Sequence, residues 1–197
     1  MQVSQYMEPT GKCRLAAIGL GGNLPTAFGS PASALAGALA ALGRAGLEIR
    51  AVSRFFRTPA YPPGSGPDFV NAAALLLTDL APEELIRRLH EVEAEFGRVR
   101  ERRWAARTVD IDLLFMDDMV LPDEATYDRW RKLDPERQTQ EAPDCLILPH
   151  PRMHERGFVL IPLAEIAPKW RHPAIGRTVA EMVKALPAAD KDAISPL

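Results

Sequence analysis

The chain has 197 residues, of which 47% are hydrophobic and 25% are charged, and its net charge is −2. This is enough material for one domain with a real core, and the charge balance indicates neither a nucleic-acid-binding protein nor a disordered one. The two cysteines, Cys13 and Cys145, lie far apart and form no zinc-binding pattern. The N-terminus has no apolar signal core and no run of about 18 apolar residues predicts a membrane span, so we expect a cytoplasmic protein.

Hydrophobic periodicity and turn residues set the expected order of elements. Residues 1–13 are expected to form a disordered or extended tail before a single domain over 14–190. Within that domain the pattern predicts a strand at 14–20, a helix that follows the N-cap Ser30 and runs to about Leu42, strands near 47–51 and at 69–78, a helix at 82–96 and a strand at 109–116. This β-α-β-β-α-β order predicts an α+β sandwich of the ferredoxin-like type.

The remaining segments are expected to add a loop, an insertion, and an extra C-terminal strand and helix. Residues 58–67 hold four prolines and two glycines, which predicts a restrained loop. Residues 117–145 are charged and irregular, and we interpret them as a surface insertion. The apolar stretch 158–163 predicts one more strand, and 179–186 predicts a last short helix.

The most informative segment is the strand that carries Asp110 and Asp112. Alternate residues of a strand face the same way, so both carboxylates share one face while Ile111 and Leu113 point into the core. Their spacing of about 6.6 Å along the strand suits two cations about 3.5–4 Å apart. Mg²⁺ prefers a few carboxylates together with phosphate oxygens and water. The alternative for this motif alone is a half-exposed strand with acids on its solvated face.

Arginines are concentrated immediately before the acid pair, at Arg98, Arg100, Arg102, Arg103 and Arg107. Guanidinium groups beside metal-binding acids match the needs of a polyphosphate, because both share the negative charge that moves during transfer. A solvated basic loop and an RNA-facing patch, interrupted by the aromatic Trp104, stay open as alternatives.

Two further features are weak on their own. The segment Gly19–Leu24 fails as a dinucleotide motif, because GxGxxG requires glycine at position 24, and no P-loop lysine follows. It remains a glycine turn that lets the backbone approach a ligand closely. Phe69 and Asn71 share a strand face that could hold a flat heterocycle by stacking and hydrogen bonds, although a core phenylalanine and a strand-edge asparagine explain the pattern equally well.

The last cluster lies between prolines and the strand expected at 158–163. His150, His154 and Arg156 fall in this turn and could bind phosphate. A zinc site is disfavoured, because Pro151 argues against a regular helix between the histidines and no third protein ligand is evident.

Taken together, these segments resemble the 6-hydroxymethyl-7,8-dihydropterin pyrophosphokinase family, in order and nearly in spacing. The matching stretches are Ile18–Leu24, Ser53–Pro59, Pro67–Ala73, Glu93 with Gly97–Arg100, Trp104 with Arg107–Asp112, and Leu148–Arg152 with Arg156–Phe158. No single stretch is decisive, but the ordered set is highly specific and covers most of residues 15–170. Two departures are Phe69, where many members carry tyrosine, and Gly22, where serine is usual.

The resemblance implies a division of roles on the phosphate side. Asp110 and Asp112 would hold two Mg²⁺ ions that bridge the phosphates of ATP. Arg98 and Arg107 would contact the phosphates and assist transfer. The remaining ATP-binding residues would be Glu93, Arg100, Trp104, His150 and Arg156, with Arg100 and Trp104 on a mobile loop that closes over the site.

On the pterin side the resemblance implies a stacked and hydrogen-bonded ring. Phe69 and Phe158 would enclose the ring, and Asn71 would hold its polar edge. Thr58 and Tyr61, on the proline-rich loop, would border the pterin through backbone groups. Asn23 would lie in a second loop nearby.

The implied function is transfer of a diphosphate from ATP to 6-hydroxymethyl-7,8-dihydropterin, with AMP as the other product, in folate biosynthesis. We expect a monomer that acts on small molecules and binds neither nucleic acid nor membrane. One alternative is a ferredoxin-like RNA-binding module, against which the paired acids speak because they would repel a nucleic-acid backbone. The other is a metal-dependent nucleotide hydrolase, which the acid pair alone does not exclude.

Overall fold

The computed structural model describes residues 13–60, 66–97, 108–134, 137 and 141–197. Its centre is a six-stranded antiparallel sheet in the order β5-β1-β4-β3-β6, with β2 paired to β4 as well. The strands are β1 (Arg14–Gly22), β2 (Glu48–Val52), β3 (Phe56–Thr58), β4 (Phe69–Thr78), β5 (Asp110–Met116) and β6 (Ser195–Pro196). The predicted ferredoxin-like order is confirmed, with the short β3 and β6 as additions. The expected tail lies, apart from Cys13, outside the described residues.

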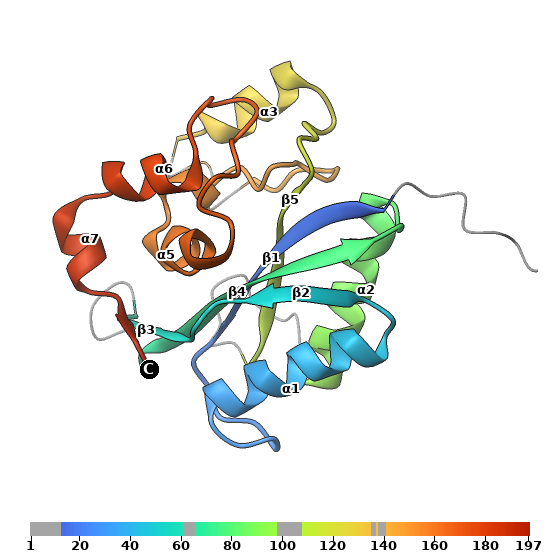
Figure 1. Ribbon diagram of the computed structural model, residues 1–197, viewed down its shortest axis with the longest axis vertical. Coiled ribbons are helices and arrows are strands. Elements are labelled where there is room, and N and C mark those ends of the chain that lie inside the picture. The colour runs from blue at the N-terminus through green and yellow to red at the C-terminus, as the bar shows by residue number, and fades with distance from the viewer. Residues whose placement is uncertain (1–12, 61–65, 98–107, 135–136, 138–140) are drawn as a thin grey trace, which may run out of the picture.

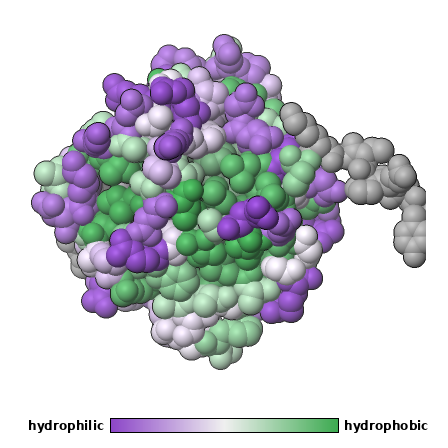
Figure 2. Space-filling model, viewed as in Figure 1, coloured by the Kyte–Doolittle hydropathy of each residue, from purple (hydrophilic) through white to green (hydrophobic). Residues whose placement is uncertain are grey.

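Helices cover both faces of this sheet (Figure 1). One face carries α1 (Pro31–Arg44) and α2 (Pro82–Glu95). The other carries the C-terminal helices, which are α5 (Gly157–Ile166), α6 (Val179–Ala185) and α7 (Ala188–Asp192), with a short 3₁₀ turn η1 (Met153–Glu155) before them. The helix α3 (Glu124–Arg131) lies within the insertion that follows β5. Figure 2 shows apolar side chains gathered over β2 and β4 in the middle of the view, with polar side chains around them.

The first helix begins where the sequence predicts and ends slightly later. The side chain of Ser30 accepts a hydrogen bond from the Ser33 backbone, and Pro31 occupies the first turn. The helix continues to Arg44, and Gly46, at φ +85°, turns the chain into β2. The expected end at about Leu42 was therefore early by two residues.

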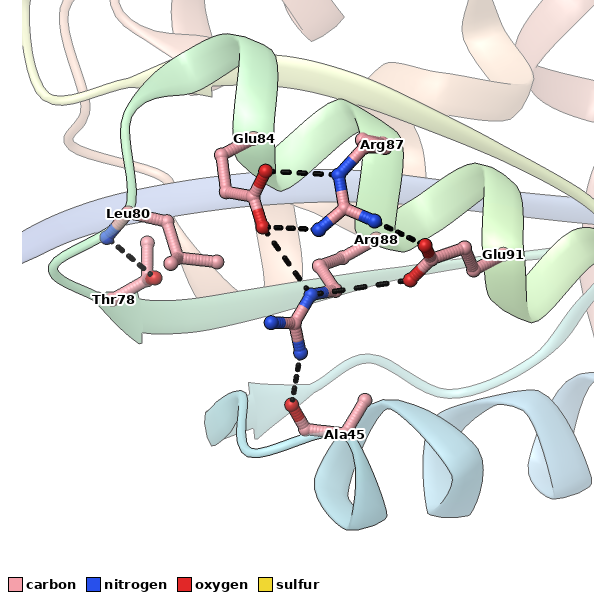
Figure 3. A network of polar contacts seen from close by, with 7 residues as sticks. All are labelled: Ala45, Thr78, Leu80, Glu84, Arg87, Arg88 and Glu91. Carbon is pink, nitrogen blue, oxygen red and sulfur yellow. Dashed lines mark hydrogen bonds and ion pairs between the residues drawn. The ribbon is translucent and has the colours of Figure 1, made fainter.

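Polar contacts tie α2 to the end of α1 (Figure 3). The Arg88 guanidinium donates a hydrogen bond of 3.1 Å to the carbonyl of Ala45, just past the end of α1. Arg87 pairs with Glu84 and Glu91 along the exposed side of α2. The Arg88 contact satisfies a carbonyl that the helix leaves unpaired, whereas the exposed ion pairs contribute little stability.

The segment 158–163 is helical, so the expectation of a strand there was wrong. It forms most of α5, whose residues Val159, Leu160 and Leu163 are buried against the sheet. A continuous apolar run has no period of two or 3.6, and it fits a buried helix as well as a buried strand. The predicted helix at 179–186 is confirmed as α6, although it is not the last, because α7 follows.

The insertion at 117–145 is more ordered than its composition indicates. Asp123 caps α3 by accepting a hydrogen bond from the Thr126 backbone. Tyr127, on α3, is fully buried, and its hydroxyl lies 2.9 Å from Nε2 of His172. The indole of Trp170 stacks on Phe115 of β5 with ring centroids 3.9 Å apart. The described part of the insertion is therefore packed against the C-terminal segment, through the contact of Tyr127 with His172.

The two faces of the sheet bury two separate apolar clusters. The larger lies under α1 and α2 and includes Ile18, Leu76 and Ile111. The smaller lies under α5 and α6 and includes Ala17 and Leu114. This second cluster covers only part of its face of the sheet, and the rest of that face carries polar residues.

Candidate active site

The register of the sheet brings Asp110, Asp112 and Asn71 together on one face. β1 runs between β4 and β5, with Gly21 opposite Asn71 on one side and Asp110 on the other. Gly19 lies opposite Asp112. Directly opposed residues of antiparallel strands point to the same side. The glycines therefore form a low floor between the acids of β5 and the amide of β4, and both glycines and both acids are only half-buried.

The acid pair is held from behind by a buried glutamate. Glu93, on α2, is 1% exposed, and its Oε1 accepts a hydrogen bond of 2.7 Å from the backbone of Ile111. Ile111 lies between Asp110 and Asp112 on an edge strand. Its N–H points away from β1 and needs a partner outside the sheet. The contact shows Glu93 supporting the acid-bearing strand, while its expected contact with ATP stays a prediction.

The donor set of β5 fits Mg²⁺. Two half-buried carboxylates on one strand face supply hard oxygen ligands and leave room for others. Within the described residues no group of three or more histidine, cysteine or acidic side chains gathers as a closed metal cage. A pair of carboxylates that takes its remaining ligands from phosphate and water is the arrangement that Mg²⁺ prefers.

The turn before α5 places His150 beside the acids. Its backbone N–H donates to the carbonyl of Leu114 at 2.7 Å, and its Nδ1 accepts from the backbone of Arg152 at 3.1 Å. Burial lowers the pKa of His150 to about 4, with the Asp112 carboxylate opposing the shift and Arg156 adding to it. At neutral pH the ring is therefore uncharged, and because Nδ1 accepts, Nε2 carries the proton and can donate it to a ligand.

Arg156 and Phe158 lie at the start of α5. Burial lowers the pKa of Arg156, opposed by the charge of Asp112, yet a guanidinium stays protonated at neutral pH. Its guanidinium carbon lies 5.7 Å from the centre of the Phe158 ring, and Phe158 is 40% exposed. The turn that holds His150 thus leads into a helix, not into the expected strand, and Phe158 projects from the first helical turn.

The pterin-side residues lie on β3 and β4. Phe69 is half-buried and lies opposite Thr58, while Asn71 is buried and lies opposite Phe56. Thr58 is the last residue of β3, so the expectation that it lies on the proline-rich loop was wrong. Its hydroxyl accepts a hydrogen bond of 2.5 Å from Nδ2 of Asn71. Sequence reasoning missed this contact, because nothing local in the chain indicates the register between β3 and β4.

Asn23 joins two loops near the site. It is 5% exposed, and its Nδ2 donates a hydrogen bond of 3.2 Å to the carbonyl of Pro67. This contact links the end of β1 to the segment that enters β4. The expected contact of Asn23 with the pterin stays a prediction.

Some of the expected site residues lie outside the part of the chain that the structure describes. They are Tyr61, Arg98, Arg100, Trp104 and Arg107. His154 is described and lies in η1. Its pKa is lowered by burial and by the charge of Arg131 on α3, which places it toward the insertion.

Solved structures share this fold. The chain superimposes on Plasmodium falciparum HPPK-DHPS with a TM-score of 0.63 over 90% of its length, at 14% identity. An A437G variant of that protein with STZ-DHP gives 0.64 over 89%. The chain spans 45% and 46% of those two longer chains. At this identity the likeness establishes the fold alone.

None of the helices among the described residues combines the length and apolar character needed to cross a bilayer.

Sequence comparison is more specific. The family model described as 7,8-dihydro-6-hydroxymethylpterin-pyrophosphokinase (HPPK) matches residues 17–168. The 2-amino-4-hydroxy-6-hydroxymethyldihydropteridine pyrophosphokinase of Synechocystis is 37% identical over 88% of this chain and 76% of its own length. The protein of that name from Haemophilus influenzae is 34% identical over 85% of this chain and 89% of its own. The chain belongs to the 7,8-dihydro-6-hydroxymethylpterin-pyrophosphokinase family.

Proposed function

We propose that the protein transfers the terminal diphosphate of ATP to the hydroxyl of 6-hydroxymethyl-7,8-dihydropterin, giving AMP and the pterin diphosphate, as a step of folate biosynthesis. The observation that carries this proposal is the shared sheet face. Asp110 and Asp112 lie on one side of the glycines of β1, and Asn71 with Phe69 lies on the other. A polyphosphate held at the acids and a flat ring held at the amide would meet over the glycine floor.

The reaction forms one P–O bond and breaks another. The pterin hydroxyl oxygen attacks the β-phosphorus, the bond from that phosphorus to the α–β bridging oxygen breaks, and the electron pair leaves with AMP. The hydroxyl proton passes to solvent or to a phosphate oxygen. No described side chain has to act as a strong base, because positioning and charge neutralisation supply most of the catalysis of phosphoryl transfer.

Two Mg²⁺ ions would be held by Asp110 and Asp112. When bound, they would offset the charge of the phosphates and align the attacking and leaving oxygens. His150 donates from a neutral ring, which allows it to contact a phosphate oxygen without competing for the cations. Arg156 supplies a partly desolvated positive charge next to Asp112, and its fork of donors suits a phosphate.

The pterin would lie against Phe158 and Phe69, with its polar edge on Asn71. Phe158 presents one face to the Arg156 guanidinium and is 40% exposed, so ring surface remains for a ligand. Offset stacking on such a ring is worth about 0.5–1.5 kcal/mol beyond area burial. The polar edge of the ring requires a hydrogen-bonding partner that water cannot easily replace, and the buried amide of Asn71 provides it.

We further propose a monomer acting in the cytoplasm on small molecules, with no nucleic-acid partner. Asp110, Asp112 and Asn71 lie on neighbouring strands of one sheet, which supports a site formed within one chain. Light scattering coupled to size-exclusion chromatography tests this state directly, and a mass near twice 21.7 kDa would contradict it.

The product pattern tests the reaction. We expect ATP, Mg²⁺ and reduced hydroxymethylpterin to give AMP and pterin diphosphate in equal amounts, with no accumulation of ADP. Chromatographic separation of the nucleotides, with ATP alone as the control, measures this. ADP or free phosphate as the main product would favour a nucleotide hydrolase instead.

A further inference from the structure

The first turn of α5 receives little support from its own helix. It carries two of the proposed ligand-binding side chains, with Arg156 at the N-cap and Phe158 in the turn itself. The arginine side chain has no acceptor for the free N–H groups of that turn. Pro162 lacks the N–H that would bond the carbonyl of Phe158, four residues earlier. The position of this turn therefore depends on what packs against it from outside.

The packing comes through Gly157, which is buried and lies between those two residues. A Cβ at position 157 would come within 3.0 Å of Cδ1 of Ile194, whereas the next atoms, in Leu186 and Asp190, would lie 3.7 Å away. The first distance is tighter than nearly all real Cβ contacts, and the second is ordinary van der Waals contact. Ile194 therefore occupies the space that a side chain at position 157 would need, directly against the backbone of the turn.

Residues 194–197, which we call the strap, link this turn to the other side of the proposed pterin site (Figure 1). Within the strap, Ser195–Pro196 form β6, which pairs with β3. The N–H of Leu197 donates a hydrogen bond of 2.9 Å to the carbonyl of Phe55, just before β3. At its other end β3 finishes opposite Phe69 of β4. The strap thus connects the first turn of α5 with the strand that lies beside Phe69.

We propose that Ile194 is a positioning residue for both substrates: it holds the backbone at Gly157, so that Phe158 faces the pterin and Arg156 faces the triphosphate. This rests on the proposed function, in which those two side chains bind the ligands. Ile194 itself contacts neither ligand and acts through the turn alone. The strap lies beyond residues 17–168, the part of the chain that the family model matches, so the family assignment gives it no role.

The first experiment compares Ile194→Ala with the matched control Ile166→Ala, both in the full chain. The two isoleucines are partly buried, but Ile166 lies at the far end of α5. Calorimetry measures the dissociation constant of a nonhydrolysable ATP analogue with Mg²⁺, and then that of 6-hydroxymethyl-7,8-dihydropterin in the presence of both. The temperature is kept well below the melting temperature of each variant, so a loss of stability alone leaves both constants unchanged.

We expect Ile194→Ala to weaken the pterin about two- to tenfold, up to the value of the aromatic stack that it positions. The ATP analogue should also bind more weakly, because Arg156 belongs to the same turn. Ile166→Ala should lower the melting temperature without changing either dissociation constant. Wild-type constants in Ile194→Ala would reduce the strap to a structural element and overturn the proposal.

A double variant tests whether the effect passes through Phe158. In a Phe158→Ala background, Ile194→Ala should weaken the pterin no further, because the ring that it positions is gone. It should still weaken the ATP analogue, because Arg156 remains. Additive losses of pterin affinity would mean that Ile194 affects this ligand by another route, which contradicts the proposal.

A complementary pair of changes keeps the proposal testable if Ile194→Ala fails to fold. Gly157→Ala places a Cβ against Cδ1 of Ile194, and Ile194→Val removes that atom. We expect Gly157→Ala to weaken both ligands and the double variant to recover most of the lost affinity. Without recovery, the direct contact between the two positions would not be what holds the turn. A wild-type protein that forms no AMP from ATP and the reduced pterin would instead refute the proposed function, which separates the two failures.

Discussion

One face of the central sheet has two halves that are built from the same strands. Under α5 the strands present Ala17, Leu75 and Leu114, which are buried in an apolar cluster. Further along the same strands the residues that point to this face are glycines, acids and an amide, and solvent reaches most of them. The strand backbone is continuous through both halves. We call the half under α5 the covered half and the other the open half. The covered half therefore anchors the positions of side chains in the open half, which have no apolar packing of their own.

The contrast shows how one element serves both stability and chemistry. Burial of apolar side chains under α5, together with the larger cluster on the opposite face, provides the free energy that keeps the strands in register. The acids of β5 lie close together and repel each other when no cation is bound. Residues held on strands are positioned more accurately than residues on loops. Changes in the open half should affect activity, and changes in the covered half should affect stability.

The largest expected effect is the loss of an acid from the open half. Asp110→Ala and Asp112→Ala should each lower kcat by about a hundred- to a thousandfold, because metal-assisted charge neutralisation is worth several kcal/mol. The melting temperature should stay the same or rise, since one of two repelling charges is gone. Steady-state assays at saturating Mg²⁺ and thermal unfolding measure the two quantities.

Asp118→Ala is the matched control for the acid variants. Asp118 is an exposed acid in the turn that follows β5, outside the site. It should leave both activity and melting temperature near the wild-type values. Near-normal turnover in either Asp110→Ala or Asp112→Ala would contradict the assignment of the acids as metal ligands.

The covered half should respond in the opposite way. Leu160, on α5, is fully buried, and Leu160→Ala should lower the free energy of unfolding by about 2–5 kcal/mol. Activity per folded molecule should stay close to that of the wild type. Urea unfolding measures the free energy of unfolding. The matched variant Ile161→Ala, at a partly buried neighbour on the same helix, should lower it less. A loss of kcat without a loss of stability would mean that the two halves are not separable.

Much of the open half was predictable because it depends on local patterns. Alternation placed Asp110 and Asp112 on one strand face, and the structure has both there, half-buried. Capping residues and a period of 3.6 located α1 and α2 to within a turn. These features depend on residues a few positions apart, and such residues are visible in the sequence.

The rest depends on contacts between distant segments. Tyr127 is buried with its hydroxyl 2.9 Å from Nε2 of His172, which lies 45 residues away, and nothing near Tyr127 in the chain indicates this partner. The bond between Thr58 and Asn71 requires the register of β3 against β4. The sequence predicts a strand where α5 forms, because an apolar run long enough to cross a sheet face fits either element.

A pH titration would sharpen the comparison at the far end of β5, where the insertion packs. His172 is fully buried, and burial lowers its pKa to about 4, with the charges of His154 and Arg131 adding to the shift. An unfolded histidine binds its proton below about pH 6.5. The unfolded state thus holds more protons than the folded state between about pH 6.5 and pH 4, and stability should fall as pH falls through this window.

His172→Gln isolates that contribution, because glutamine can still form a hydrogen bond with the Tyr127 hydroxyl and does not titrate. The slope of unfolding free energy against pH should be smaller in the variant by up to one proton, about 1.4 kcal/mol per pH unit. His150 also has a pKa of about 4, so part of the slope should remain. Equal slopes in the two proteins, measured by urea unfolding from pH 4.5 to pH 7, would show that His172 is not held neutral by the fold.

The smallest expected effect concerns Phe158, which lies at the boundary between the two halves. Its helix belongs to the covered half, but its ring is 40% exposed beside Arg156. Phe158→Ala should weaken the pterin at least several-fold, because a lost aromatic stack is worth about 0.5–1.5 kcal/mol beyond area burial. ATP should bind almost as before, since its expected contacts are the acids, His150 and the arginines. Calorimetry with each ligand separates these outcomes. Phe28→Ala is the control, because Phe28 is 50% exposed and packs on Phe96 of the apolar cluster under α1 and α2. Equal weakening of pterin and ATP in Phe158→Ala would mean that the start of α5 had shifted as a whole, and that the ring holds the turn in place instead of the pterin.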